Sequence, residues 1–134
     1  MWTCPKCERN FKTANQSHSC VDVSLDDLFS GKPEELLLTF DRLLSELVNW
    51  EEVSVGTSKN AVIFTNRKAW LIVRPMSKEL DLKFYNDEAL SSGLIKKITE
   101  YRGKYAHHIR IREESELSNS LYKLLWVGYK YALR

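Results

Sequence analysis

Glycine and proline are scarce in this sequence, with five and three residues among 134, and no segment has the composition of a flexible linker. The longest apolar runs are too short to cross a bilayer, which requires about 20 apolar residues in a helix. Residues 1–4 lack the charged start and the apolar core of a secretory signal. We therefore expect a cytoplasmic protein without a membrane-spanning segment.

An overall charge of one sign is also lacking, because 20 basic and 18 acidic residues leave a net charge of +2. The charges are unevenly distributed, since residues 21–52 carry nine acids and two bases, whereas residues 53–134 carry fifteen bases and eight acids. Two interpretations stay open. The acidic and basic parts can neutralise each other in the fold, or the basic part can face an anionic partner.

Cysteine is equally sparse, and all three cysteines lie within the first twenty residues. A disulfide framework would favour an even number. Cys4 and Cys7 form a Cys-x-x-Cys pair, and His18 and Cys20 follow after a spacer of ten residues. Structural zinc prefers thiolate and imidazole ligands, and four protein ligands leave no open position for water. The sequence therefore predicts a structural zinc ion, the one expected cofactor, in a module of residues 1–21.

Two helices are expected directly after this module. Ser24 and Asp27 have the spacing of a capping box, which predicts a short helical turn that stops at Gly31. Pro33 suits the first position of a second helix, where its missing N–H costs nothing. Apolar residues at helical spacing give this second helix a buried stripe as far as about Asn49.

The remaining pattern predicts an α+β domain over residues 22–134, with an antiparallel sheet of about five strands between N-terminal and C-terminal helices. Alternating or continuous apolar runs place these strands at residues 53–55, 61–64, 69–73, 80–85 and 106–112. We expect a short helix near residues 95–101. A last helix should begin at Ser115 and carry a buried stripe that includes Gly128, with a second, aromatic stripe through Trp126 and Tyr129.

The N-terminal motif resembles the finger that precedes an uncharacterised bacterial family, a domain of unknown function related to the YdhG-like α+β fold. It reads Trp2-x-Cys4-Pro5-x-Cys7-x-Arg9-x-Phe11, followed by Asn15-Gln16-x-His18-x-Cys20. Gly31-Lys32-Pro33 and residues 70–75 and 108–129 extend the similarity over nearly the full length. The resemblance implies a YdhG-like domain over residues 22–134 and the four zinc ligands, but no established activity. Glu8 departs from the pattern, because the finger usually carries glycine there.

A basic segment with interleaved tyrosines is the other candidate site, because phosphates and bases bind such surfaces. Its residues are Lys96, Lys97, Arg102, Lys104, His108, Arg110 and Arg112. Arg110 and Arg112 should share one face of a strand, whereas His107 and His108 should point to opposite faces. The competing interpretation is a solvated surface whose charges pair with the acidic helices.

No phosphate loop, nucleophile elbow or metalloprotease helix is present, so we expect a protein that is not an enzyme. The favoured function is a non-enzymatic binding or interaction module, with a protein partner or a homodimer formed through the C-terminal helix. The alternative is a nucleic-acid-binding accessory protein that uses the finger and the basic segment of residues 96–112. No membrane partner is expected.

Overall fold

The computed structural model describes residues 2–3, 10–11 and 25–133. Two short strands near the N-terminus, β1 (Trp2–Thr3) and β2 (Asn10–Phe11), pair in antiparallel orientation. The predicted zinc ligands lie outside the described residues: Cys4, Cys7, His18 and Cys20. The zinc site therefore stays a prediction.

The helices α1 (Leu25–Phe29) and α2 (Glu34–Leu47) precede the main sheet, as the sequence predicts. Gly31 lies between them with a φ of 74°, a left-handed conformation that glycine adopts at little steric cost. Pro33 is the N-cap of α2, one position before the one expected, and acidic residues occupy the first helical turn. The partial positive charge of a helix N-terminus stabilises such acids.

Six strands form one antiparallel sheet in the order β3-β4-β5-β6-β8-β7. The strands are β3 (Ser54–Thr57), β4 (Val62–Thr65), β5 (Ala69–Pro75), β6 (Leu80–Asn86), β7 (Ile95–Tyr101) and β8 (Lys104–Ile111). Sequence neighbours pair throughout, except that β8 inserts between β6 and β7 and leaves β7 at the edge. The α+β class and the antiparallel sheet are confirmed.

The edge strand β7 corrects one prediction, because residues 95–101 form a strand and not a short helix. Residues 86–105 are of mixed composition, and their sequence predicted a short helix and loops. Arg102 and Gly103, however, both have positive φ, 48° and 81°, and they form the two-residue turn between β7 and β8. Such turns match the twist of an antiparallel hairpin. The hairpin raises the sheet from the expected five strands to six.

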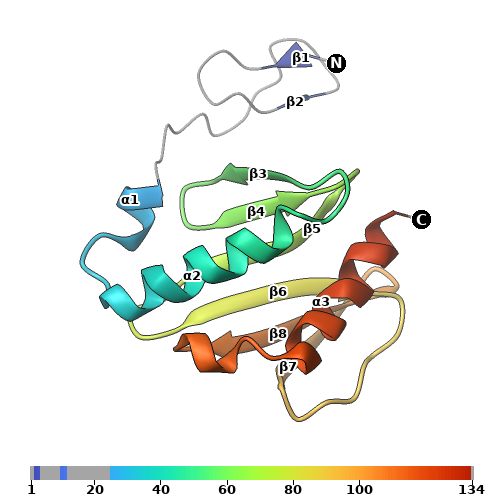
Figure 1. Ribbon diagram of the computed structural model, residues 1–134. Coiled ribbons are helices and arrows are strands. Elements are labelled where there is room, and N and C mark those ends of the chain that lie inside the picture. Colours follow the sequence, from blue (N-terminus) through green and yellow to red (C-terminus); the bar gives the residue numbers. More distant parts are fainter. Residues whose placement is uncertain (1, 4–9, 12–24, 134) are drawn as a thin grey trace.

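The two long helices, α2 and α3 (Asn119–Ala132), lie on the same face of the sheet (Figure 1). A short 3-10 turn, η1 (Glu114–Glu116), precedes α3. Ser118 caps α3 by accepting a hydrogen bond from the N–H of Leu121 at 3.2 Å. The last helix therefore begins later than the sequence predicted from Ser115. No helix of the described chain combines the length and the apolar character needed to span a bilayer.

The hydrophobic core lies between the helices and this face of the sheet. Its largest fully buried side chains include Trp70, Phe40, Phe64 and Phe84. Gly128 allows the backbone of α3 to come close to β6, since a Cβ atom on residue 128 would lie 2.9 Å from the Cβ of Phe84. The core therefore occupies one side of the sheet, and no described helix packs on the other side.

Candidate functional site

The face of the sheet opposite α2 and α3 carries no described helix, and we call it the open sheet face. Its side chains follow from the cross-strand register, because residues directly opposite each other on neighbouring strands share a face. In one row, Arg74 of β5, Asp81 of β6 and Arg110 of β8 lie side by side. The next row contains Ile72, Lys83, His108 and Lys97.

The open sheet face is basic within the described part of the chain. Asp81 is the acidic residue that the strands contribute to this face, and Glu79 lies at the border of the face, just before β6. The register places five bases there: Arg74, Lys83, Lys97, Lys104 and Arg110. This excess of positive charge gives the surface a potential that attracts anions.

Asp81 is buried, at 4% exposure, although it lies on the open sheet face. His108 Nδ1 lies 3.1 Å from Asp81 Oδ2, and Arg110 donates its Nε–H to Asp81 Oδ1 at 3.3 Å. Arg110 Nη1 also lies 3.4 Å from Glu79 Oε1, and Arg112 Nε lies 3.6 Å from Glu79 Oε2. Such donors offset the cost of taking a carboxylate out of water. Arg110 therefore neutralises Asp81, and His108 lies within hydrogen-bond distance of the same carboxylate.

Tyr85 lies between two lysines on the same face. The ammonium nitrogen of Lys104 is 4.4 Å from the centre of the Tyr85 ring, and that of Lys83 is 5.7 Å from it. A cation over an aromatic ring contributes about 0.5–1 kcal/mol at exposed sites. These contacts hold two positive charges beside one aromatic ring.

The structure divides the seven residues of the predicted basic segment into two groups. Four of them share the open sheet face: Lys97, Lys104, His108 and Arg110. The other three lie elsewhere: Lys96 in the bulge of β7, Arg102 in the hairpin turn and Arg112 after the end of β8. The expected pairing with the acidic helices is wrong for Arg110 and Arg112, whose described partners are acids of the sheet region.

The candidate site predicted from the sequence did not include three residues that lie on the open sheet face: Arg74, Lys83 and Tyr85. Alternation along β5 and β6 places each of them on the polar side of its strand. That signal does not show that β6 lies beside β8, which follows only after the long segment that contains β7. The pairing of strands distant in sequence therefore assembles the site.

Metal-binding side chains do not form a cluster in the described part of the chain. No group of three histidine, cysteine or acidic residues there is arranged to hold an ion. The four predicted zinc ligands are not among the residues searched, so this finding leaves the zinc prediction untested.

His107 points away from the open sheet face and is fully buried on the helix side. Its ring stacks on Phe84 with centroids 5.0 Å apart, and its Nε2 accepts a hydrogen bond from the N–H of Leu90 at 3.0 Å. Burial lowers the pKa of His107, and a backbone contact at Tyr105 offsets part of this effect. The neutral imidazole therefore attaches the loop after β6 to the core.

Acid should destabilise the fold through His107. Because its folded pKa lies below the unfolded value of 6.5, the contribution is complete above that value and is lost as the pH falls through the folded pKa. The free energy of unfolding should fall by up to about 1.4 kcal/mol per pH unit across this window. The His107→Gln protein should show a smaller fall in urea titrations at pH values of about 7.5 and 5.

The neighbouring histidine supplies the control for that measurement. His108→Gln should keep most of the acid sensitivity that arises from His107, because burial is the main cause of the lowered pKa of His107 and the charge of His108 is the smallest cause. Equal pH dependence of wild type and His107→Gln would contradict the assignment.

An aromatic cluster lies where α3 passes the end of α2. Trp50 stacks on Trp70 at 5.6 Å and meets Trp126 edge-on at 5.2 Å. Tyr129 is buried beside them and donates its hydroxyl hydrogen to the carbonyl of Glu51 at 2.6 Å. The expected aromatic stripe is therefore divided, since Tyr129 belongs to the core whereas Trp126 is 44% exposed.

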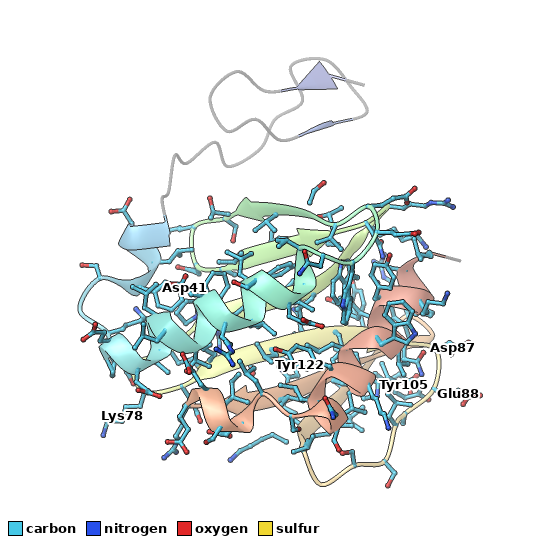
Figure 2. The ribbon with its side chains drawn as sticks, in the orientation of Figure 1. Asp41, Lys78, Asp87, Glu88, Tyr105 and Tyr122 are labelled. Atoms are coloured by element: carbon cyan, nitrogen blue, oxygen red, sulfur yellow. The ribbon has the colours of Figure 1, made fainter. Side chains whose placement is uncertain are left out.

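A shallow groove of about 390 Å³ follows this cluster. Its lining residues are Trp50, Asn119, Tyr122, Lys123 and Trp126. Figure 2 shows Tyr122 on the side of α3 that faces α2. Burial raises the pKa of Tyr122, and nearby Glu46 adds to the effect. The groove is the second candidate site of the described residues, on the face opposite the first.

Residues 25–132 match a family model described as Domain of unknown function (DUF5655). No curated protein and no solved structure matches the chain. The matched segment extends from α1 to the end of α3 and therefore contains the complete open sheet face.

Proposed function

Since the chain belongs to the DUF5655 family of domains of unknown function, we propose its role from its own residues: a non-enzymatic module that binds single-stranded nucleic acid. The site of binding is the open sheet face. One observation carries the proposal, namely that five bases and Tyr85 share a surface without a described helix, with Lys83 and Lys104 next to the Tyr85 ring. Cations neutralise backbone phosphates, and an aromatic ring offers a stacking surface to an unpaired base.

The shape of the surface favours a single strand. An exposed sheet with aromatic side chains is one way in which proteins hold unpaired bases. Neighbouring strands lie about 4.8 Å apart, so Lys83 and Lys97, on either side of β8, are about 10 Å apart along the sheet. An extended strand can contact both lysines while a base stacks near Tyr85. Asp81 serves the site by holding His108 and Arg110 in place and supplies no chemical step.

Structural zinc is part of the same proposal, with Cys4, Cys7, His18 and Cys20 as ligands. The spacing of these residues supports it. The pairing of Thr3 with Asn10 also supports it. These two residues flank the Cys-x-x-Cys pair in the sequence, so the chain returns to the same place on both sides of that pair. We further propose that residues 22–134 have the YdhG-like fold, on the resemblance of sequence and on the helices before and after the sheet.

A protein interface on α3 is the second candidate function, and exposed Trp126 favours it. Tryptophan is enriched at protein interfaces because it combines a large apolar area with a polar N–H group. This candidate and the first use opposite faces of the sheet. Substitutions on one face therefore leave the other intact.

Nucleic acid binding should be strongly salt-dependent. In fluorescence anisotropy with labelled single-stranded RNA and DNA, the logarithm of the association constant should fall linearly with the logarithm of salt concentration, by about 0.7 per phosphate contact. The double variant Lys83→Ala and Lys97→Ala should lower this slope by about 1.4 and weaken binding at moderate salt. Arg110 is unsuitable for the test, because its removal would leave the carboxylate of Asp81 short of a partner.

The matched control is the double variant Lys59→Ala and Lys78→Ala, which removes the same charge from exposed turns outside the strands that form the open sheet face. Figure 2 shows Lys78 at the turn between β5 and β6. This control should bind almost as tightly as wild type. Absence of salt-sensitive binding by the wild type, or an equal loss in both double variants, would overturn the proposal.

A further inference from the structure

Two hollows adjoin on the helix side of the sheet, and Tyr122 lines both of them. One is the aromatic groove of about 390 Å³ described above. The other has a volume of about 700 Å³ and lies between α2 and the segment from η1 to the start of α3. We call the two hollows together the helix-side groove. An apolar part beside a few polar groups is the usual composition of a small-molecule site.

The helix-side groove carries charges of both signs. Arg42 and Glu46 are four residues apart on α2, so they lie on one face of this helix. Glu114 of η1 lines the same hollow, and Lys123 of α3 lines the aromatic part. Two bases and two acids leave the groove without a net formal charge. No ion pair between described residues includes any of these four side chains, so their charges are available to a ligand.

Tyr122 joins the charged part to the aromatic part. Its side chain lies on the side of α3 that faces α2 (Figure 2). Burial raises the pKa of Tyr122 and the charge of Glu46 raises it further, whereas the charge of Arg42 acts in the opposite direction. Both charges are therefore close enough to act on the phenol group, which stays protonated at neutral pH and can donate a hydrogen bond to a ligand.

The aromatic part offers ring surfaces at the other end of the groove. Trp50 and Trp126 meet edge-on at 5.2 Å, and Trp126 is exposed. A further aromatic ring can join such a pair, because rings attract one another in stacked and edge-on arrangements. A ligand that matches both parts has an aromatic ring at one end and both an ammonium group and a carboxylate at the other.

We propose that the helix-side groove binds a free amino acid with an aromatic side chain. The ring of the ligand lies against Trp50 and Trp126. Its ammonium group meets Glu46 and Glu114, and its carboxylate meets Arg42. The inference does not rest on nucleic acid binding, because the groove lies on the helix side of the sheet, opposite the open sheet face.

Nuclear magnetic resonance of the isotope-labelled full chain, titrated with L-phenylalanine, tests the proposal. A ligand of this size in an open groove should bind with a dissociation constant on the order of 1 mM. The indole N–H signals of Trp50 and Trp126 should shift and saturate. The backbone amide signals of Lys83 and Lys97, on the open sheet face, should not shift.

Three related compounds separate the contributions of the ligand groups. Phenethylamine lacks the carboxylate and phenylpropionate lacks the ammonium group, so each should bind about two- to fivefold more weakly than L-phenylalanine. L-Alanine keeps both charges but lacks the ring, and it should cause no saturable shift of the two indole signals. Equal affinities of L-phenylalanine and either singly charged compound would refute the proposed ligand class.

Arg42→Gln identifies the partner of the carboxylate. In this variant L-phenylalanine should bind no more tightly than phenethylamine, because the base that distinguishes the two compounds is absent. Glu46→Gln should likewise reduce the difference between L-phenylalanine and phenylpropionate. Arg102→Gln is the matched control, since it makes the same charge change in the exposed turn between β7 and β8. It should keep the affinities of the wild type.

Far-UV circular dichroism should show that every variant is folded, because each substituted side chain is exposed. Absence of a saturable shift in the wild type overturns the proposal, as do shifts confined to residues outside the groove. An equal loss of L-phenylalanine affinity in Arg42→Gln and Arg102→Gln overturns it as well, because a general effect of charge would then replace a specific contact.

Discussion

The Cys7→Ser protein is expected to contain almost no zinc, whereas the wild type should contain one zinc ion per chain, as four protein ligands require. A serine hydroxyl stays protonated at neutral pH and does not replace a thiolate. Three remaining ligands leave the ion open to water and to competing chelators. Because structural zinc contributes roughly 10–16 kcal/mol to the folding of small zinc modules, this is the largest effect that we predict. Elemental analysis of purified protein measures it.

Ser19→Ala is the control for this substitution, because it changes a residue between His18 and Cys20 without removing a proposed ligand. It should retain the full zinc content. Chelation of the wild-type chain should leave most helix and strand signal in far-UV circular dichroism, since the described core is formed by residues from Leu28 onward. Wild-type protein without zinc, or with thiols that react freely, would refute the proposed site.

Phe84→Ala is expected to reduce the free energy of unfolding by about 3–5 kcal/mol, as large-to-small changes at buried aromatic residues do. Phe84 is fully buried, stacks on His107 and lies directly below Gly128 of α3. Removal of the ring leaves a cavity between β6 and α3. The surrounding structure can close this cavity only in part. A loss of this size is a large fraction of the total stability of a small domain. Urea denaturation of the wild type and the variant measures it.

The neighbouring residue provides the comparison. Tyr85→Ala changes an aromatic residue on the same strand, but its side chain lies on the open sheet face and is only half-buried. We expect it to cost about 1 kcal/mol or less from lost cation–π contacts. Similar losses of stability in the two variants would show that the sheet does not have one core face and one open face.

Most elements of the main domain could be predicted from local sequence patterns. The stripe through Leu36, Phe40, Leu43 and Leu47 predicted α2, and the structure buries these residues. Alternation predicted β6 and β8 because each strand has one face in the core. Helical and strand periodicity arise from the geometry of the chain itself, so a long amphipathic segment carries its own evidence.

Residues 95–101 were mispredicted as a helix because they lack this amphipathic periodicity. β7 is exposed on both faces, so burial imposes no alternation on its sequence. Hydrogen bonds to β8 stabilise it as a strand, and the turn at Arg102 and Gly103 sets their register. Gly103 was the one local signal in the sequence, because glycine readily adopts the positive φ that a two-residue hairpin turn requires.

The sequence by itself determined the α+β class, the order of most elements, the faces of β6 and β8 and a specific hypothesis for zinc. These features depend on short-range spacing, which the chain carries wherever it folds. Only the tertiary structure decided which charges meet. Asp81 is 27 residues from His108 in sequence, yet their side chains lie 3.1 Å apart because β8 pairs with β6. The same pairing adds Lys83 and Tyr85 to the basic face. Strand pairing over such distances is selected by the burial of the whole core, which no local pattern records.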